Sequence, residues 1–452
     1  MSESEYFDVI IVGCGAAGIA TGIDLHEANI SSFVILEARD RIGGRAYTKM
    51  LDGIPVDLGA NWIHHYSPNN PLYKYTQNGE LLADNQWHTD LLYDYDGSSI
   101  PLHVTRKAQR IAQTLFNIVD DYRNKVLKEQ ATDVSIAEVI EHAYEKEVQG
   151  LLPQCKRVVD LIMGGVEQYE ASNLEKLSAT YYEAGNGDFE CDKFVQYGYG
   201  LLLQKIGHNL PVRLNTIVTH VDTSDRSLIE IRTNHTNYTC KYLLITIPLG
   251  CLKKETIMFH PRLPEWKLAA IRQMGFGLMN KIILQFPYNF WNSATYINRT
   301  SNLIRGEFRC MYSLHAQYNL SNENCNILVI FTTGNFAYEI ETLTDQESIE
   351  RVMKILRTLF ESNEVLIPNP LKFLISRWSH DPFAYGSYSN FAVNATEQIV
   401  FDLSQECFLN RVHWAGEHTN EGSTIGCVDS AFESGQREAK KIIEKLNIVK
   451  AS

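Results

Sequence analysis

Two charged residues stand where a side chain could take part in a reaction. Lys281 lies on the apolar, strand-like run of residues 281–286, where an amine is costly to bury unless it is paired or has a function. Glu37 directly follows a second apolar run, residues 33–36. A solvent-facing edge strand is the alternative for Lys281, so the surrounding elements must decide what each residue can do.

The elements before Glu37 have the order of a dinucleotide-binding unit. Residues 7–12 predict a buried strand, residues 13–18 form the turn GCGAAG, and a helical stretch to Asn29 precedes the second strand. In such a turn the first glycine permits the bend, the second lets backbone N–H groups approach a pyrophosphate, and the third lets helix and sheet pack closely. Glu37 is then placed to accept hydrogen bonds from ribose hydroxyls.

Composition narrows the possible functions. With 452 residues, 44% apolar and 21% charged, the chain is typical of a soluble globular protein of two or three domains. Its net charge of −13 argues against a nucleic-acid partner, and it would attract cationic substrates or simply aid solubility. The nine cysteines include no CxxC pair, which predicts neither a disulfide framework nor a metal site and favours a reducing compartment.

We expect a cytoplasmic protein that is a monomer or a weak homodimer. The first residues, MSESEYFDVI, lack the basic and apolar regions of an export signal. No run approaches the roughly 18 apolar residues of a membrane span, so we expect no membrane partner.

The middle of the chain predicts a helical insertion. Residues 103–185 have apolar positions at helical spacing and two capping boxes, Ser135 to Glu138 and Ser172 to Glu175. Strands are predicted after it, at residues 211–221, 227–232 and 242–248.

The last third of the chain predicts a mixed α and β cap and a return to the first domain. Residues 280–395 combine strand-like runs with a helix at residues 345–360. A strand at residues 412–415 and an amphipathic helix from about residue 431 to residue 446 follow. These patterns indicate one compact body built from discontinuous domains.

Several segments together resemble the flavin-containing amine oxidase family, whose members include monoamine oxidases, polyamine oxidases and histone lysine demethylases. These segments are GCGAAGIATGIDL, LEARDRIGGRAYT, VDLGANWIH, RLNTIVTHVD, ITIPLGCLK, MGFGLMNKIILQF, DPFAYGSYS, and WAGEHT followed by SAFESGQREA. The resemblance implies FAD and an α/β fold, with a Rossmann-like FAD-binding domain of the GR2 type and a discontinuous α+β substrate-binding domain. We expect the FAD-binding domain at residues 1–85, 198–285 and 396–452, and the substrate-binding domain at residues 86–197 and 286–395.

The resemblance also assigns residues along the cofactor. Arg41 and Arg45 would offer a cation and backbone donors beside the diphosphate. Val221 would place its backbone against the adenine, and Glu417 would accept from a ribityl hydroxyl. The last helix would direct its N-terminus at the flavin edge where reduction places negative charge. The full expected set is Gly13, Gly15, Ala16, Ala17, Gly18, Glu37, Arg39, Arg45, Gly59, Ala60, Asn61, Trp62, Val221, Glu417, Cys427 and Val428.

At the reaction centre, Lys281 matches the lysine that in this family lies beside flavin N5 through a water, and it is the expected catalytic residue. Tyr388 matches one wall of the family's aromatic sandwich, whereas Cys427 stands where monoamine oxidases have the second tyrosine. This departure argues against a small aromatic monoamine as substrate. Ser387 replaces the cysteine that monoamine oxidases bond to the flavin, so we predict non-covalent FAD.

Residues around this centre point to a cationic polyamine. The segment of His64 resembles that of spermine and acetylpolyamine oxidases, and the ring could accept a hydrogen bond from an ammonium or be purely structural. Trp62, Trp378 and Tyr385 are candidates for the walls of an amine tunnel or for the core. We therefore expect oxidation of spermine, spermidine or an N-acetyl derivative: hydride passes to the flavin, the imine is hydrolysed to an aldehyde and an amine, and O2 becomes H2O2.

Three alternatives stay open. Histone demethylases carry an extra domain and a helical hairpin, for which we expect no room in 452 residues. An amine or amino-acid oxidase or a desaturase of the same superfamily is the second. A substrate carboxylate would need an arginine in the cap, and the sequence identifies none. A flavin-binding scaffold without turnover is the third, and the presence of Lys281 argues against it.

Overall fold

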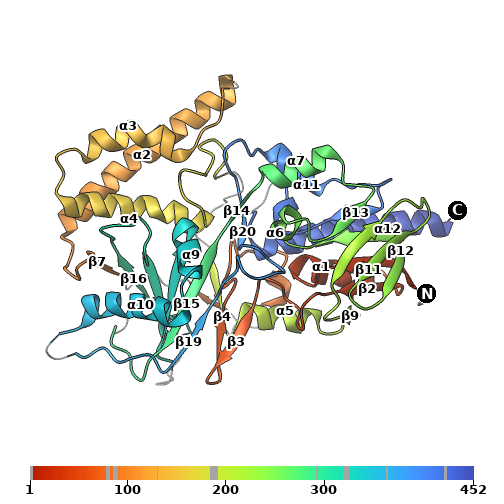
Figure 1. Ribbon diagram of the computed structural model, residues 1–452, viewed down its shortest axis with the longest axis horizontal. Coiled ribbons are helices and arrows are strands. Elements are labelled where there is room, and N and C mark those ends of the chain that lie inside the picture. The colour runs from red at the N-terminus through yellow and green to blue at the C-terminus, as the bar shows by residue number, and fades with distance from the viewer. Residues whose placement is uncertain are drawn as a thin grey trace.

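The larger sheet holds the glycine-turn unit and lies in the right half of Figure 1. The computed structural model describes residues 4–77, 82–84, 90–129, 131–183, 192–291, 294–318, 325–362, 365–421 and 425–451. The strand order of this sheet is β13-β10-β11-β12-β1-β2-β9, and β21 also pairs with β12. Its strands are β1 (Glu5–Val12), β2 (Phe33–Leu36), β9 (Val212–Arg213), β10 (Val218–Asp222), β11 (Ile229–Thr233), β12 (Asn237–Ile245), β13 (Met258–His260) and β21 (Val412–Trp414).

The direction of the strands explains their sequences. β1 pairs in parallel with both β2 and β12, and these strands end in the continuous apolar runs that predicted burial. Parallel strands are covered on both faces, so they need no alternation of polar residues. β11 is antiparallel to its two neighbours, β10 and β12, and the expected α/β class is confirmed.

Helices α1 (Ala16–Glu27) and α12 (Val428–Ala451) pack closely against each other beside this sheet. The hydroxyl of Thr21 donates to the carbonyl oxygen of Gly435 at 2.9 Å. A Cβ added to Gly435 would lie 2.2 Å from the carbonyl oxygen of Ala17. The approach of the two backbones therefore requires glycine at this position.

Replacing Gly435 with Ala should destabilise the protein, although Ala normally stabilises a helix interior by about 1 kcal/mol relative to Gly. The new methyl group meets backbone that cannot rotate away, and we expect a loss of about 1–3 kcal/mol. Urea unfolding measures it, with Lys440→Ala on the exposed side of α12 as control. A midpoint equal to or above that of the wild type would contradict this packing.

The second sheet has six strands and lies in the left half of Figure 1. Its order is β19-β15-β18-β17-β16-β7, and all neighbours are antiparallel except β16 and β7. The strands are β7 (Leu91–Tyr93), β15 (Met279–Gln285), β16 (Tyr296–Arg299), β17 (Cys310–Ser313), β18 (Ile327–Thr333) and β19 (Lys372–Ile375). β15 belongs to this sheet, although the expected division at residue 285 assigns it to the FAD-binding part. The domain limits stay a prediction.

The helical insertion is confirmed, and one of its two capping boxes is wrong. Helices α2 (Leu102–Glu129), α3 (Ile136–Val148) and α4 (Pro153–Glu170) share a core of their own. Ser135 caps α3 by accepting from the N–H of Glu138 at 3.1 Å. No helix begins at Ser172, because α4 ends there with Ala171 in the left-handed conformation, and Glu175 instead pairs with Arg305.

The remaining elements connect these bodies. Small sheets pair β3 (Thr48–Leu51) with β4 (Ile54–Asp57), β14 (Gly275–Gly277) with β20 (Tyr388–Asn390), and β8 (Lys193–Val195) with both β5 (Trp62–Ile63) and β6 (Leu82–Asp84). The other helices are η1 (Tyr73–Tyr75), α5 (Tyr199–Gly207), α6 (Leu249–Lys253), α7 (Glu265–Gln273), α8 (Leu314–Tyr318), α9 (Gly334–Glu341), α10 (Asp345–Phe360), α11 (Glu397–Ser404) and η3 (Glu417–Thr419). Among the described residues, no helix combines the length and the apolar character needed to cross a membrane.

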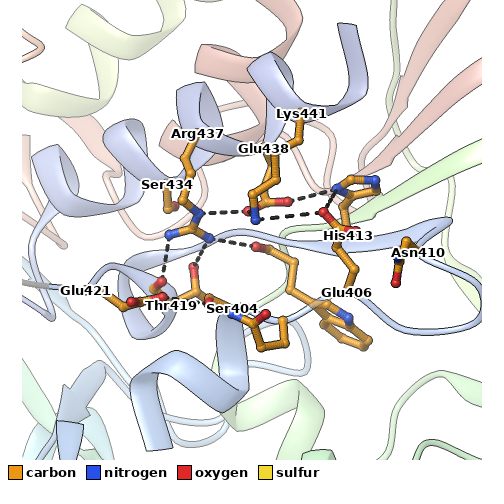
Figure 2. A network of polar contacts seen from close by, with 12 residues as sticks. Ser404, Glu406, Asn410, His413, Thr419, Glu421, Ser434, Arg437, Glu438 and Lys441 are labelled. Carbon is orange, nitrogen blue, oxygen red and sulfur yellow. Dashed lines mark hydrogen bonds and ion pairs between the residues drawn. The ribbon is translucent and has the colours of Figure 1, made fainter. Parts of the chain in front are cut away.

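A buried polar network fixes α12 to β21 and η3 (Figure 2). Nδ1 of His413 lies 2.8 Å from a carboxylate oxygen of Glu438, and neither side chain is exposed. Nε of Arg437 donates to the same carboxylate at 2.7 Å. The Nη atoms of Arg437 donate to the carbonyl oxygens of Thr419 at 2.7 Å and of Trp414 at 3.0 Å.

The same cluster has the spacing of a metal site but not the charge. Ligand atoms of Glu406, His413 and Glu438 lie within 4.8 Å of one another. However, Nζ of Lys441 lies 3.1 Å from Glu438, and Nζ of Lys445 lies 2.7 Å from Glu406. Because these cations already compensate the carboxylates, we assign the network to holding α12 in place.

Glu438 should make the protein lose stability in acid. Burial alone would raise the pKa of Glu438, but His413 and Arg437 outweigh it and lower the pKa to about 2 from an ordinary 4.5. Since the folded-state pKa is the lower one, this stabilisation is complete above pH 4.5 and is lost as the pH falls toward 2. We expect the free energy of unfolding of the wild type and Glu438→Gln to converge on acidification, by on the order of 3 kcal/mol. A difference independent of pH would contradict this assignment.

Candidate functional site

One cavity of about 1020 Å³ extends from the glycine turn of the larger sheet to α4 and the second sheet. Its wall includes most of the expected cofactor residues: Gly13, Gly15, Ala16, Ala17, Glu37, Arg39, Arg45, Gly59, Ala60, Asn61, Trp62, Glu417, Cys427 and Val428. It also includes Lys281 and all the expected substrate residues: His64, Trp62, Tyr388, Cys427, Trp378 and Tyr385. Gly18 and Val221 are the two expected contacts that lie outside the wall.

The glycine turn forms an anion-binding end of this cavity. Gly13 has φ of +104°, a conformation that strains any other residue. No side chain caps α1 at Gly15, so the N–H groups of its first turn, at Ala16 and Ala17, are open to the cavity. Gly18 packs directly against the turn. A Cβ at this position would lie 2.1 Å from the carbonyl oxygen of Gly13, so only glycine fits. A phosphate suits this helix N-terminus.

Glu37 holds the turn and faces the cavity. Its carboxylate accepts from the N–H of Cys14 at 2.6 Å and of Arg39 at 2.9 Å. Burial raises its pKa, and the two backbone donors oppose this shift. The guanidinium of Arg39 donates through both Nη atoms to Asp381 at 2.8 Å. Arg41, expected beside the diphosphate, lies outside the wall and stacks on a tyrosine ring.

Arg45 and Glu417 form an ion pair between distant parts of the chain. Nη1 of Arg45 donates to Oε1 of Glu417 and to the carbonyl oxygen of Ser387, both at 2.8 Å. Glu417 also accepts from the hydroxyl of Ser389 at 3.2 Å and from the N–H of Gly426 at 3.0 Å. Burial alone would raise the pKa of Glu417, but Arg45 and the other partners outweigh it, so the residue is a carboxylate.

Val221 lies outside the wall of the cavity, so its expected backbone contact with the adenine stays a prediction. Its side chain is fully buried in the core of the larger sheet. The wall is formed instead by Thr216, Ile217 and Val218, where β10 begins. The expected strand therefore meets the cavity, but with its first residue rather than its fourth.

Lys281 is buried in the middle of the second sheet, so the edge-strand alternative is wrong. β15 pairs with β18 on one side and β19 on the other, and Lys281 is 3% exposed. Its Nζ donates to the carbonyl oxygens of Gly59 at 2.5 Å and Asp57 at 3.1 Å, and to Oδ1 of Asn61. Burial lowers the pKa of Lys281, and Asp57 opposes this shift.

Asp57 is the counter-charge of Lys281, and it was missed in the sequence. It is 1% exposed and accepts from the N–H of Tyr199 at 3.0 Å and the hydroxyl of Thr48 at 2.5 Å. The amide of Asn61 links the two charges, because its Nδ2 donates to Asp57 at 3.3 Å while its Oδ1 accepts from Lys281. The VDLG segment thus orients the lysine as well as shaping the cavity.

Tyr388 and Cys427 lie on neighbouring parts of the wall. A Cβ on Gly426 would lie 3.2 Å from the ring of Tyr388, so the segment before α12 rests against this ring. The Tyr388 hydroxyl donates to the carbonyl oxygen of Tyr169 at 2.8 Å. Cys427 directly precedes Val428, the first residue of α12, and the helix N-terminus therefore faces the cavity.

His64 is paired and half-buried. Its Nδ1 lies 2.8 Å from a carboxylate oxygen of Asp192, which also accepts from the N–H of His65 at 3.2 Å. The His64 ring lies 6.5 Å from the ring of Tyr169. A histidine with this partner can present its other ring nitrogen to a ligand.

The three other aromatic candidates line the cavity with different partners. Trp62 contacts Phe194 and Tyr312 edge-on, and its buried Nε1 has no hydrogen-bond partner among the described residues. Nε1 of Trp378 donates to a backbone carbonyl oxygen at 3.1 Å. Tyr385 has φ of +56° and follows a buried alanine.

The sequence alone did not reveal the contribution of α4 and β17. Gln168, Tyr169 and Glu170 end α4, and Arg309 precedes β17, and all four line the cavity. Burial raises the pKa of the Tyr169 phenol, reinforced by Cys427 and Glu170. No local sequence motif identifies these residues as part of a site. For Arg309 the one available signal was a charged residue directly before an apolar strand.

Residues 16–443 match the family described as flavin containing amine oxidoreductase. The chain belongs to this family. FAD is therefore its cofactor, and the expected family is confirmed.

This amine oxidoreductase is similar to proteins that are named for different amine substrates. "Probable polyamine oxidase 4" of Arabidopsis thaliana is 28% identical, over 97% of this chain and 88% of the relative. "Lysine-specific histone demethylase 2" of Homo sapiens is 31% identical, over 96% of this chain and 53% of the relative. The fold matches a solved structure of putrescine oxidase bound to putrescine with a TM-score of 0.77, at 18% identity and over 98% of this chain and 100% of that one.

The described residues fit FAD. The open N–H groups at Ala16 and Ala17 suit the diphosphate, and Glu37 suits a ribose. Glu417 can accept from a ribityl hydroxyl while Arg45 balances its charge. The N-terminus of α12 suits the edge of the ring system that becomes negative on reduction.

Ser387 should leave the flavin unattached. Its hydroxyl accepts from the N–H of Met279 and donates to the carbonyl oxygen of Met279, both at 2.8 Å, and serine cannot form a thioether. We expect acid precipitation to leave the flavin absorbance in the supernatant, whereas gel filtration of the untreated protein keeps flavin and chain together. Yellow precipitated chain would refute this prediction.

Proposed function

We propose that this amine oxidoreductase is a polyamine oxidase acting on spermine, spermidine or their N-acetyl derivatives. The observation that carries the proposal is the lining of this cavity. Its part around Lys281 and Tyr388, which we call the substrate chamber, also includes carboxylates outside the expected cofactor set. These are Asp90, Glu170 and Asp192. A long cationic amine matches a chamber in which acids and aromatic rings share the wall.

Different residues of the substrate chamber serve binding and reaction. The carboxylates attract protonated nitrogens, while the apolar wall near Tyr388 lowers the pKa of the amine that must react in its neutral form. When bound, FAD supplies the acceptor for a hydride from the α-carbon of that amine. The resulting imine is hydrolysed, so the overall reaction converts amine, O2 and water into aldehyde, shorter amine and H2O2.

The side chain of Lys281 is fixed by the protein itself and needs no direct contact to substrate. Its three bonds to oxygen use all three donors of an ammonium group. A water that binds Lys281 during turnover must therefore replace one of these acceptors or donate to the neutral amine. This is the role proposed for the residue in reduction and reoxidation.

A substrate panel tests the proposal. The purified yellow protein is mixed with spermine, spermidine, their N-acetyl forms and a dimethyl-lysine peptide, and H2O2 and organic products are followed by fluorescence and mass spectrometry. Lys281→Met is the control for contaminating oxidases. We expect H2O2 and a cleaved polyamine, and no H2O2 with any polyamine would overturn the proposal.

The peptide arm addresses a second function. Relatives of similar identity are named histone demethylases, so oxidation of methyl-lysine with release of formaldehyde would favour that class. If no amine bleaches the flavin in the absence of O2, a flavin-binding scaffold without turnover would be favoured instead. The proposal also includes a reducing, cytoplasmic setting and a monomer or weak homodimer, which the free thiols of the described cysteines support.

A further inference from the structure

Arg309 is a partly buried cation in the wall of the substrate chamber. Its Nε donates to the carbonyl oxygen of Leu161 at 2.8 Å, and its Nη1 donates to Oε1 of Gln168 at 3.0 Å. The guanidinium lies against α4 where two glycines leave room for it, since a Cβ on Gly165 would lie 3.2 Å from Nη2. The fold therefore holds the group rigidly.

The charge of Arg309 is not compensated by an ion pair. Among the described residues, no carboxylate lies within ion-pair distance of Arg309, whereas the nearby Arg305 has two and Arg299 has one. Glu167, the neighbouring carboxylate that favours the charged form of Arg309, is bonded to Arg305 at 2.7 Å. A partly buried cation that lacks an ion-pair partner is stabilised by a ligand that brings an acceptor.

Arg309 is connected to the reaction centre in two ways. The carbonyl oxygen of Gln168 accepts from the Tyr388 hydroxyl at 3.3 Å, while its side chain accepts from Arg309. On the other side, Tyr312 of β17 donates to Asn61, the partner of Lys281, at 3.3 Å. Three residues of extended chain separate positions 309 and 312, which is about 10 Å. Arg309 can thus contact the distal end of an extended substrate whose other end reaches the reaction centre.

We propose that Arg309, held by Gln168, forms a subsite for an oxygen acceptor at the distal end of the amine substrate. Nη2 of Arg309, which has no hydrogen-bond partner among the described residues, donates to an amide carbonyl or a carboxylate. A second ammonium at this place would instead meet a like charge. This inference rests on the proposed function and narrows it: amines that end in an acyl group or a carboxylate are preferred over those that end in a free amine.

The test uses three probes of equal length that share one reacting secondary amine. Their distal ends are a primary ammonium, an acetamide and a carboxylate, and kcat/KM is measured with the FAD-loaded protein. We expect the wild type to prefer both oxygen-ended probes, with the carboxylate first if charge dominates. Arg309→Met should reduce this preference about 10- to 100-fold, mainly through KM, and Arg309→Lys should retain part of it.

Controls separate this inference from the function on which it rests. Arg110→Met, on the exposed side of α2, should leave all three values unchanged, and thermal midpoints and flavin content show whether the variants are folded. A wild type that prefers the ammonium probe, or an Arg309→Met variant that changes all three probes by one factor, overturns the subsite. If the wild type oxidises no probe, the proposed function fails, and the change of flavin absorbance on probe binding still decides the preference at Arg309.

Discussion

Lys281→Met should slow flavin reduction by amine, reoxidation by O2, or both, by about 10²- to 10⁴-fold, and the protein should keep its FAD. Methionine has a similar length and tolerates burial, but it cannot bind a water or carry a proton. The expected FAD contacts at the glycine turn, Glu37 and Arg45 are untouched by this change. Asp57 then loses its counter-charge, and it can take up a proton because burial raises its pKa.

Stopped-flow spectroscopy distinguishes the two half-reactions. Flavin bleaching by a substrate without O2 reports reduction, and mixing reduced protein with O2 reports reoxidation. Lys354→Met, exposed on α10, is the matched control and should behave as the wild type. A variant that loses FAD instead would mean that Lys281 holds the cofactor rather than serving the reaction.

Arg45→Met should weaken FAD binding by about 10²- to 10³-fold, the loss expected when one partner of a buried ion pair is removed. Glu417 would be left as a buried carboxylate, and the bound diphosphate would add a second negative charge nearby. The side chain of Glu417 is only 4% exposed, so water cannot compensate it. Fluorescence titration of the FAD-free protein with FAD measures the affinity.

A double variant checks the cause of this loss. Arg45→Met combined with Glu417→Gln should recover part of the affinity, because the uncompensated charge is gone. Arg45→Lys should keep most of the electrostatic effect and lose the second bond, to the carbonyl of Ser387. A double variant that binds FAD no better than Arg45→Met alone would show that the ion pair is not the reason.

Local patterns in the sequence were sufficient for the elements that form the glycine turn. The strand, turn and helix around Gly13 are consecutive, and each follows from short-range sterics and periodicity. The helix predicted at residues 345–360 is α10 with the same bounds. Val221 was assigned by the family resemblance, and periodicity could identify its strand but not that Val218 is the residue in the cavity wall.

Contacts between distant residues could not be predicted. Lys281 and Asn61 are 220 positions apart, and Arg309 and Gln168 are 141 apart. Each pair depends on how two sheets and a helical insertion pack, and periodicity carries no information about that. The Ser172 box failed for a related reason, since the preceding helix ends in a left-handed turn and the side chain of Asn173 accepts from the backbone N–H of Asn335.

The contact between α1 and α12 also sets the time at which the protein can first hold its cofactor. Thr21 and Gly435 touch, yet they are 414 positions apart in the chain. At roughly 5–20 residues per second, a ribosome needs roughly 20–80 s between making one and the other. During that interval the glycine turn is made but lacks the helix whose first residues complete the wall. We therefore expect FAD to be captured only after α12 has been synthesised, and chains that stop before α12 to remain colourless.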